Sequence, residues 1–320
     1  MTEQATGALS KLIMGFEDVD DFGALATDGF EMPIVSSTLR RSRNKIQSRV
    51  IRSNYNPGRP SGGNISVAGQ IVVPLDSIAS WYWFKAIFNT LTTTGDGPYD
   101  HEFKMIGVTK RISMSIEHQF LDLAVPKYFQ FTGCKVSGFS FSVGDEGEML
   151  MTMDIVGSDR TIVSSPFDSA PTDLSSYQVI ENAHAALKEG GTTFADASNV
   201  SFQVNFNPDT SKYLIGGGGT LGAIPDGIMS LSGSNDFLFK DTALLTKAAS
   251  STESSIEMTF TKAADAKVNV KLPELEYGEA DPGIDGPQGI AVSLPYEAYF
   301  DNSSEASSMV VTLTNAEAHV

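Results

Sequence analysis

The chain has 320 residues, 41% of them hydrophobic and 19% charged, with 22 Lys and Arg against 39 Asp and Glu and a net charge of −17. This length is about twice that of a typical domain of roughly 150 residues, so two domains with their own cores are expected. The composition excludes wholesale disorder, and the lack of about 18 consecutive apolar residues or of a signal-peptide pattern predicts folding in the cytoplasm without membrane insertion.

Acidic side chains dominate the start of the chain, and residues 1–31 are predicted to form an acidic N-terminal arm. The six acids in the second half of this arm are Glu17, Asp18, Asp20, Asp21, Asp28 and Glu31. Because glycines recur among these acids, the arm could be disordered before it docks on a partner.

A basic segment follows, with no Asp or Glu between residues 32 and 75. Its seven positive residues are Arg40, Arg41, Arg43, Lys45, Arg49, Arg52 and Arg59. On a strand, the shared parity of Arg41, Arg43, Lys45 and Arg49 would place them on one face.

The favoured interpretation of this segment is pairing between subunits. We expect Arg40, Arg41, Arg43, Lys45 and Arg49 of one copy to meet Glu17, Asp18, Asp20 and Asp21 of another, because opposite charges steer assembly and define its register. A solvated strand and a phosphate-contacting strip remain as alternatives. The strip is disfavoured because no aromatic residue interrupts the basic run.

Apolar residues alternate with polar ones along most of the chain, which is typical of half-buried strands and predicts an all-β fold. In the first half the alternating segments are residues 65–73, 112–116, 139–143 and 149–155. In the second half they are residues 200–206, 256–260, 268–272, 290–294 and 309–313. The Gly-rich residues 144–148 predict a hairpin between the third and fourth segments.

Helical spacing occurs twice, each time after a strand. Apolar residues from Ile78 to Phe88 recur at intervals near 3.6, after a possible N-cap at Asp76. Residues 240–249 form a weaker second candidate.

The two halves can be superposed as sequences with Gly69 on Gly233. Each then has the order strand pair, helix, strand pair, turn, strand, which predicts two tandem β-sandwich domains with one flanking helix each. The first domain is predicted over residues 32–163 and the second over 177–320, joined by a Ser/Pro-rich linker at 164–176. Two unrelated all-β domains with a similar spacing of strands remain the alternative.

No group of residues predicts catalysis, a metal or a cofactor. Gly217, Gly219 and Gly222 satisfy a dinucleotide-binding spacing, but the following Pro225 prevents the helix that such a site requires. The four histidines lack metal-ligand spacing, and the single Cys134 can form no intrachain disulfide. With no nucleophile, base and orienting group to name together, we expect no enzymatic activity.

Several segments together resemble the tail tube proteins of long-tailed bacteriophages and prophages. They are residues 36–40, 43–48, 58–60 and 67–71, then 133–141 with 154–157, then 199–204 and 311–315. The resemblance extends from residue 16 to residue 315 and rests on patterns, none of them diagnostic alone.

This resemblance implies a structural virion protein, made in the host bacterial cytoplasm, whose stacked rings form a tube that DNA crosses during genome ejection. Two tail-tube-like domains per chain suggest a homotrimeric, pseudohexameric ring, with a hexamer carrying one decorating domain as the fallback. Implied partners are other copies, the tape measure, tail terminator and baseplate proteins, and transiently passing double-stranded DNA. The runner-up is a receptor-binding or adhesin-like β module.

Overall fold

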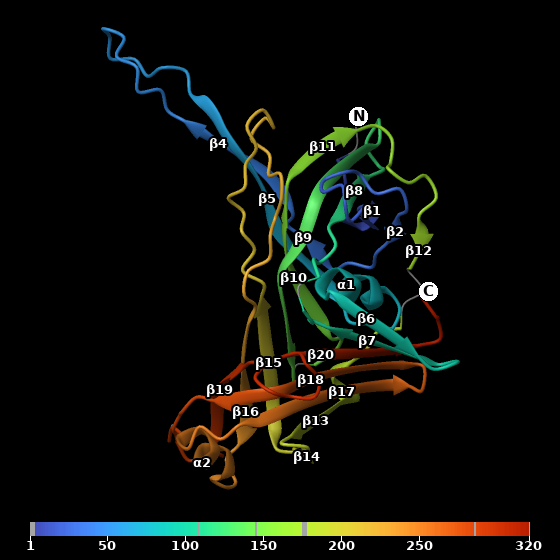
Figure 1. Cartoon of the computed structure of the whole chain (residues 1–320), viewed down its shortest axis with the longest axis vertical. Helices are drawn as coiled ribbons and strands as arrows, with labels where there is room; N and C mark the ends of the chain where they lie inside the picture. Colours follow the sequence, from blue (N-terminus) through green and yellow to red (C-terminus); the bar gives the residue numbers. More distant parts are fainter. Residues whose placement is uncertain (1–3, 108, 145, 175–177, 285, 320) are drawn as a thin grey trace.

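Strands dominate the computed structural model, which describes residues 4–107, 109–144, 146–174, 178–284 and 286–319. The strands up to residue 163 are β1 (Ser10–Phe16), β2 (Phe30–Glu31), β3 (Ser36–Ser37), β4 (Arg40–Ile46), β5 (Ser61–Pro74), β6 (Thr90–Thr94), β7 (Tyr99–Lys104), β8 (Met114–Phe120), β9 (Lys127–Val143), β10 (Leu150–Gly157) and β11 (Asp159–Val163). The later strands are β12 (Thr172–Asp173), β13 (Ala185–Glu189), β14 (Thr192–Thr193), β15 (Ala197–Asn205), β16 (Ser230–Leu238), β17 (Ser254–Ala263), β18 (Ala266–Tyr277), β19 (Ala291–Ala298) and β20 (Val310–Asn315). The helices are α1 (Ala79–Ile87) and α2 (Ala243–Ala249), with 3₁₀ turns η1 (Gly7–Leu9) and η2 (Asn182–His184). The predicted all-β class is confirmed (Figure 1).

Strands pair in the same order in both halves of the chain. The first half has the antiparallel order β4–β5–β10–β9–β8–β1, and the second has β15–β16–β19–β18–β17–β13. In addition, β11 pairs with β9 as β20 pairs with β18. Helices α1 and α2 follow the corresponding strands β5 and β16. This correspondence supports the tandem organisation, which stays a prediction.

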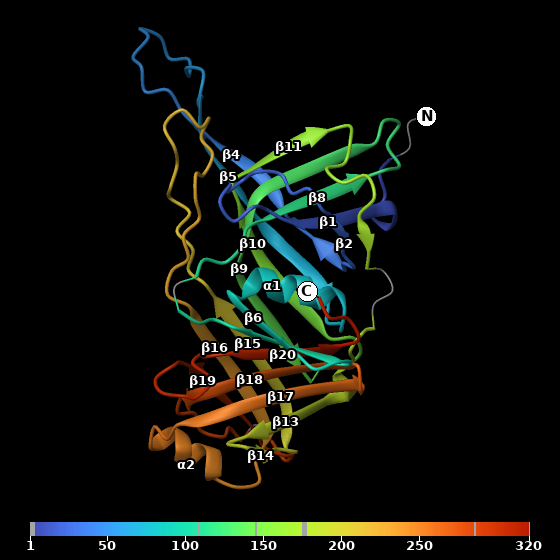
Figure 2. The ribbon, with the colours of Figure 1, turned by 45° about the vertical axis from the view of Figure 1, so that its right-hand side comes forward.

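Two strand pairings cross from one half to the other. The second part of β9 pairs with β15, and β20 pairs with β7 of the hairpin that follows α1. One large cluster of buried side chains also extends through both halves, from Leu12 to Leu313. The upper and lower parts of the molecule in Figure 2 are therefore joined by continuous sheet.

The first helix anchors the core of the first half. Its Trp83, Phe84 and Ile87 are fully buried, because α1 lies against the inner face of the sheet. The N-cap position of α1 is Ile78, two residues after the predicted Asp76, but Asp76 still caps the first turn: its Oδ1 accepts hydrogen bonds from the backbone N–H groups of Ile78 and Ala79 at 2.6 Å.

The strand assignments follow the alternation closely, with a few shifts at the ends. The predicted hairpin is confirmed by the pairing of β9 with β10, where Met153 lies opposite Phe139; Asp145 of its turn is outside the described residues. The strand expected at residues 112–116 instead begins at Met114 and extends to Phe120. Within the predicted linker, the short β12 pairs in parallel with β2, while residues 175 and 176 lie outside the described residues.

The acidic arm needs correction at residues 10–16. These residues form β1, which lies between β2 and β8, and Leu12, Ile13 and Met14 are buried. A run of consecutive apolar residues is typical of a strand that is covered on both faces. Such a strand lacks the alternation of apolar and polar residues from which the other strands are predicted. This part of the predicted arm belongs to the body of the protein.

Strands β4 and β5 continue beyond the body as a long hairpin whose tip projects into solvent (Figure 1). This hairpin (residues 41–64) is called the arm from here on; it is a different segment from the predicted acidic arm at residues 1–31. A bulge between Arg43 and Lys45 interrupts the pairing of β4 with β5. Ile51 and Tyr55 near the tip are almost completely exposed. Large exposed apolar side chains on a protruding hairpin are typical of surfaces that contact a partner.

We predict that two substitutions of Asp76 distinguish the stability contributed by its capping hydrogen bonds from the cost of burying its charge. Burial raises the pKa of Asp76 to about 6, so the folded state binds this proton more tightly than the unfolded chain. The stability that Asp76 contributes is therefore greatest below pH 4 and falls as the pH rises through about 6, by at most about 3 kcal/mol.

Asp76→Asn keeps the accepting oxygen and removes the buried charge, so it should be more stable than the wild type at pH 7.5 and comparable at pH 4. Asp76→Ala should be less stable than Asp76→Asn at both pH values by about 1 kcal/mol. Urea unfolding at the two pH values measures both differences. A wild type that gains stability relative to Asp76→Asn as the pH rises would contradict the assignment.

Candidate functional site

One face of the sheet that joins the two halves carries small polar side chains. Buried residues such as Met153, Phe139 and Phe202 point into the core, so their neighbours along each strand point to the opposite face. A row of directly opposed residues crosses six strands there: Val72, Thr152, Ser140, Gln203, Ser232 and Glu297. We call this surface the polar sheet face.

The polar sheet face forms the floor of a hollow of about 910 Å³. Its lining includes the acids Glu146, Glu148 and Glu297 and contains no Lys or Arg. Hydroxyl groups on this face bond to one another, as in the 2.9 Å contact between Ser201 Oγ and Ser234 Oγ. The face can therefore repel a polyanion weakly while offering it no cation to hold.

Sequence reasoning did not assign a role to this face. The sequence does carry a signal for this face. Ser, Thr and Gln occupy the polar positions of its alternating segments, where a solvent-exposed sheet more usually has charged residues. Which of these positions would meet across strands depends on the β9–β15 pairing, which alternation alone does not reveal.

The basic residues of the predicted interface lie on and beyond β4. Arg40 is exposed opposite Ala68, on the same side as the polar sheet face. Arg41 is half-buried, and its Nε lies 2.5 Å from Asp159 Oδ1. Arg43 donates to the carbonyl oxygens of Gly63 and Gly218, at 2.9 and 3.2 Å.

The predicted single face is correct only in part. Arg41 and Arg43 lie opposite Val67 and Ile65 and so share one side of the hairpin. The bulge at Asn44 breaks the alternation before Lys45, and Arg49 lies beyond the end of β4 at Ile46. Lys45 and Arg49 are exposed on the arm instead of extending a flat strip.

The four acids named as their partners are divided between core and surface. Asp18, Asp20 and Asp21 are exposed in the turn after β1, and in the described residues no hydrogen bond or ion pair connects them to β4. Glu17 is buried and accepts hydrogen bonds from Gly133 N (2.7 Å) and Ser115 Oγ (3.0 Å). Burial raises the pKa of Glu17, and these bonds oppose the rise.

Glu17 is therefore held within its own subunit. It is withdrawn from the predicted set of interface residues because its carboxylate bonds groups of the same chain. The pairing of Asp18, Asp20 and Asp21 with another copy stays a prediction.

The long loop between β15 and β16 is held by a buried cluster of charged side chains. The sequence did not indicate this cluster. Arg111 is 3% exposed; its Nη2 lies 2.5 Å from Asp226 Oδ1, and its guanidinium carbon lies 3.8 Å from the centre of the Phe206 ring. Lys135 also reaches Asp226, at 3.3 Å, and burial lowers its pKa. Earlier in the loop, Gly219 accepts a backbone hydrogen bond from Ile65.

These contacts place the Gly-rich loop alongside the base of the arm, where no helix follows the glycines to bind a phosphate. Through these contacts the loop connects the base of the arm to the body of the protein.

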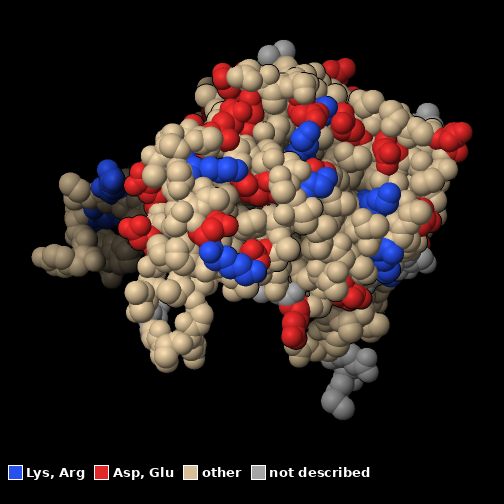
Figure 3. Space-filling view, turned by 90° about the horizontal axis from the view of Figure 1, so that it is seen from below, with Lys and Arg blue, Asp and Glu red and all other residues tan. Residues whose placement is uncertain are grey.

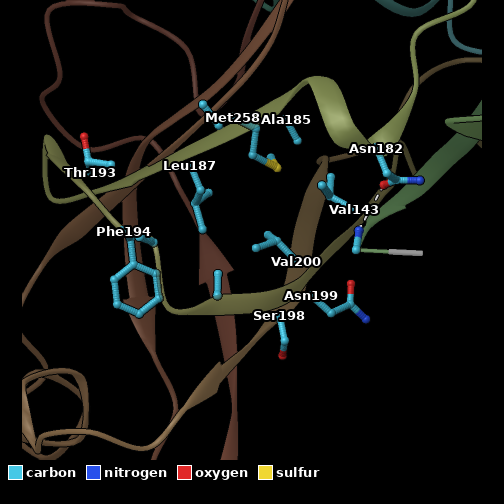
Figure 4. Close-up of a pocket in the computed structure, with 14 residues that line it drawn as sticks. Val143, Asn182, Ala185, Leu187, Thr193, Phe194, Ser198, Asn199, Val200 and Met258 are labelled. Atoms are coloured by element: carbon cyan, nitrogen blue, oxygen red, sulfur yellow. Dashed lines mark hydrogen bonds between the residues drawn. The ribbon is translucent and has the colours of Figure 1, made fainter. Parts of the chain in front are cut away.

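Another pocket, of about 380 Å³, lies between β13 and β15 (Figure 4). Leu187, Phe194, Val200 and Met258 line it together with small residues, and none of the lining side chains is acidic, basic, His or Cys. Such a lining provides no general acid or base that could activate the hydroxyl groups of Thr193 and Ser198. The buried Cys134 lies elsewhere, and burial raises the pKa of its thiol, which disfavours the reactive thiolate.

The face viewed in Figure 3 carries Asp and Glu with Lys and Arg dispersed among them, without a large patch of one sign. Among the described residues, no cluster of His, Cys, Asp or Glu is arranged to hold a metal ion. No helix in the described ranges is both long and apolar enough to cross a bilayer.

Comparisons with known proteins give one extensive match. A family model described as phage tail tube protein matches residues 7–298. A solved structure of the anti-feeding prophage baseplate, determined by cryo-EM with sixfold symmetry, is 11% identical, with a TM-score of 0.32. That match covers 51% of this chain and 98% of the other chain. No curated protein matches the chain.

We predict that Glu17 contributes to the stability of the unassembled subunit. Glu17→Ala leaves the Gly133 N–H and the Ser115 hydroxyl without their acceptor inside the protein, which should cost about 2 kcal/mol in urea unfolding of the dilute monomer. The control Asp20→Ala changes an exposed acid of the same turn and should alter stability by less than about 0.5 kcal/mol. Equal stabilities of the two variants would return Glu17 to the set of interface candidates.

Proposed function

This chain belongs to the phage tail tube protein family, and from that premise we propose that its copies form stacked rings enclosing the channel of a phage tail. It is a structural component of the virion. The observation that carries the proposal is the hollow on the polar sheet face, whose lining comes from strands of both halves and holds no Lys or Arg. We propose no enzymatic activity.

The ring is proposed to be a homotrimer with pseudohexameric symmetry. The two halves repeat one order of strand pairing, so three chains provide six similar units. A hexamer in which one half decorates the outside is the fallback. In either arrangement a closed ring removes exposed sheet edges, which are hazardous in a monomer because they promote uncontrolled pairing.

The polar sheet face is proposed to line the bore. Hydroxyl and amide side chains with a few carboxylates offer passing DNA no cation that would neutralise its phosphates, so double-stranded DNA slides without being retained. The arm, with its exposed Ile51 and Tyr55 and no acidic residue, is proposed to contact another copy. Tape measure, tail terminator and baseplate proteins are the proposed further partners, and synthesis takes place in the host cytoplasm.

Negative-stain microscopy of the concentrated protein tests the assembly. We expect hollow tubes, or rings that polymerise as the concentration rises. Arm variants such as Ile51→Asp with Tyr55→Asp should reduce polymerisation without lowering the melting temperature, because both side chains are almost completely exposed in the single chain. A monodisperse monomer at high concentration would contradict the proposal.

A lysine placed on the polar sheet face should make the bore retain DNA. Gln203 lies at the centre of the row, so tubes of Gln203→Lys should bind short duplex DNA at low salt and release it as salt rises. The control Thr210→Lys adds the same charge in the exposed loop after β15 and should retain no more DNA than the wild type. Equal retention by both variants, measured by co-sedimentation, would place the face outside the bore.

A further inference from the structure

The pairing that joins the two halves within one chain is a template for a pairing between chains. In this internal joint, β9 residues 138–143 pair with β15 residues 205–200, with Ser140 opposite Gln203 and Phe141 opposite Phe202. Its inner side is apolar, since the rings of Phe141 and Phe202 lie 4.2 Å apart and Phe139 also contacts Phe202.

One partner in the joint, β15, has a counterpart in the first half. When Gly69 is matched with Gly233, Ala68 matches Ser232. The residues opposite these two are Arg40 and Gln203, so β3 and β4 occupy in the first half the position that β15 occupies in the second. The edge of β15 that binds β9 corresponds to the outer edge of β3–β4.

The other partner, β9, has a counterpart at the end of β18. Gln70 lies opposite Asp154, and its match Ser234 lies opposite Pro295. Asp154 in turn lies opposite Gly138. In the same way, Pro295 lies beside Gly278, and its carbonyl accepts a 2.8 Å hydrogen bond from the N–H of Gly278. Gly278 therefore corresponds to Gly138, and residues 278–283 correspond to the joining segment of β9.

Both counterparts are unpaired in the single chain. Within the described ranges, β3 and β4 pair only with β5, and no strand pairs with residues 279–283. Their charges are opposite: β4 carries Arg40 and Arg41, whereas Glu279 and Asp281 are exposed in the other segment. No Lys or Arg follows Lys271 in the sequence, so the acidic segment has no basic residue near it in the chain.

We propose that residues 37–42 of one copy pair antiparallel with residues 283–278 of the next copy. The register transferred from the internal joint places Arg40 opposite Ala280 and Arg41 opposite Glu279. This inference rests on the proposed ring and identifies the edges that close it. Apolar joints within chains then alternate with charged joints between chains, and only the latter weaken as salt rises.

Disulfide cross-linking tests the register. The double variant Arg40→Cys/Ala280→Cys places thiols on residues directly opposite in the proposed pair, close enough for a disulfide. On oxidation of assembled protein we expect a ladder of covalent oligomers in a denaturing gel. The control Arg40→Cys/Glu276→Cys displaces one thiol by four residues, about 13 Å along a strand, and should cross-link poorly.

The outcomes separate the inference from the proposed function. Tubes that form but show no Arg40→Cys/Ala280→Cys cross-link, or equal cross-linking in the control, would overturn the joint and leave the tube intact. A wild-type chain that never assembles would contradict the proposed function itself. Cross-linking of the first pair only, in tubes, supports both.

Charge reversal tests the chemistry of the joint. Glu279→Arg should raise the concentration needed for assembly at least about tenfold, because it places Arg opposite Arg41. Adding Arg41→Glu should restore assembly in part, while Asp96→Arg, an equal charge change in the exposed turn before β7, should leave it unchanged. Melting temperatures monitor folding, since Arg41 also binds Asp159. Assembly of Glu279→Arg at the wild-type concentration would contradict the charged joint.

Discussion

Unpaired backbone groups at the edges of a long sheet are the constraint on which this structure depends. Within the chain, β15 satisfies the edge of β9 and thereby converts two similar halves into one continuous sheet. Among the described residues, the outer edge of β3–β4 and the segment beyond Gly278 have no paired strand. An exposed edge of this kind favours pairing with another chain, and a repeated unit makes a copy of itself the natural partner.

The continuous sheet also divides the chemistry of its two faces. Residues such as Met153, Phe139 and Phe202 form the core, and the alternating Thr152, Ser140 and Gln203 form a smooth polar surface opposite. The positive charge of the first half is concentrated on β4 and the arm, away from the acids that border the hollow. One alternating pattern thus supports core packing on one face of the sheet and a polar surface on the other.

Alternation predicted much of the fold, and its failures have physical causes. Segments with one buried face, such as residues 65–73 and 256–260, lie in β5 and β17 as expected. Alternation does not reveal β1, because this strand is covered on both faces. The predicted basic face ends at Arg43, because the bulge at Asn44 changes the side of the hairpin to which the following side chains point. The burial of Glu17 and the Arg111–Asp226 ion pair depend on contacts between distant segments, which no local pattern encodes.

Hydrogen exchange in assembled and dilute protein measures most directly whether copies complete one another's sheet. The account predicts that, within residues 37–42 and 278–283, the amides that do not already bond to β5 or β19 become protected only on assembly. Residues 200–205 of β15, already paired within the chain, provide an internal reference and should be protected in both states. Identical exchange at residues 37–42 in monomer and assembly would contradict the account.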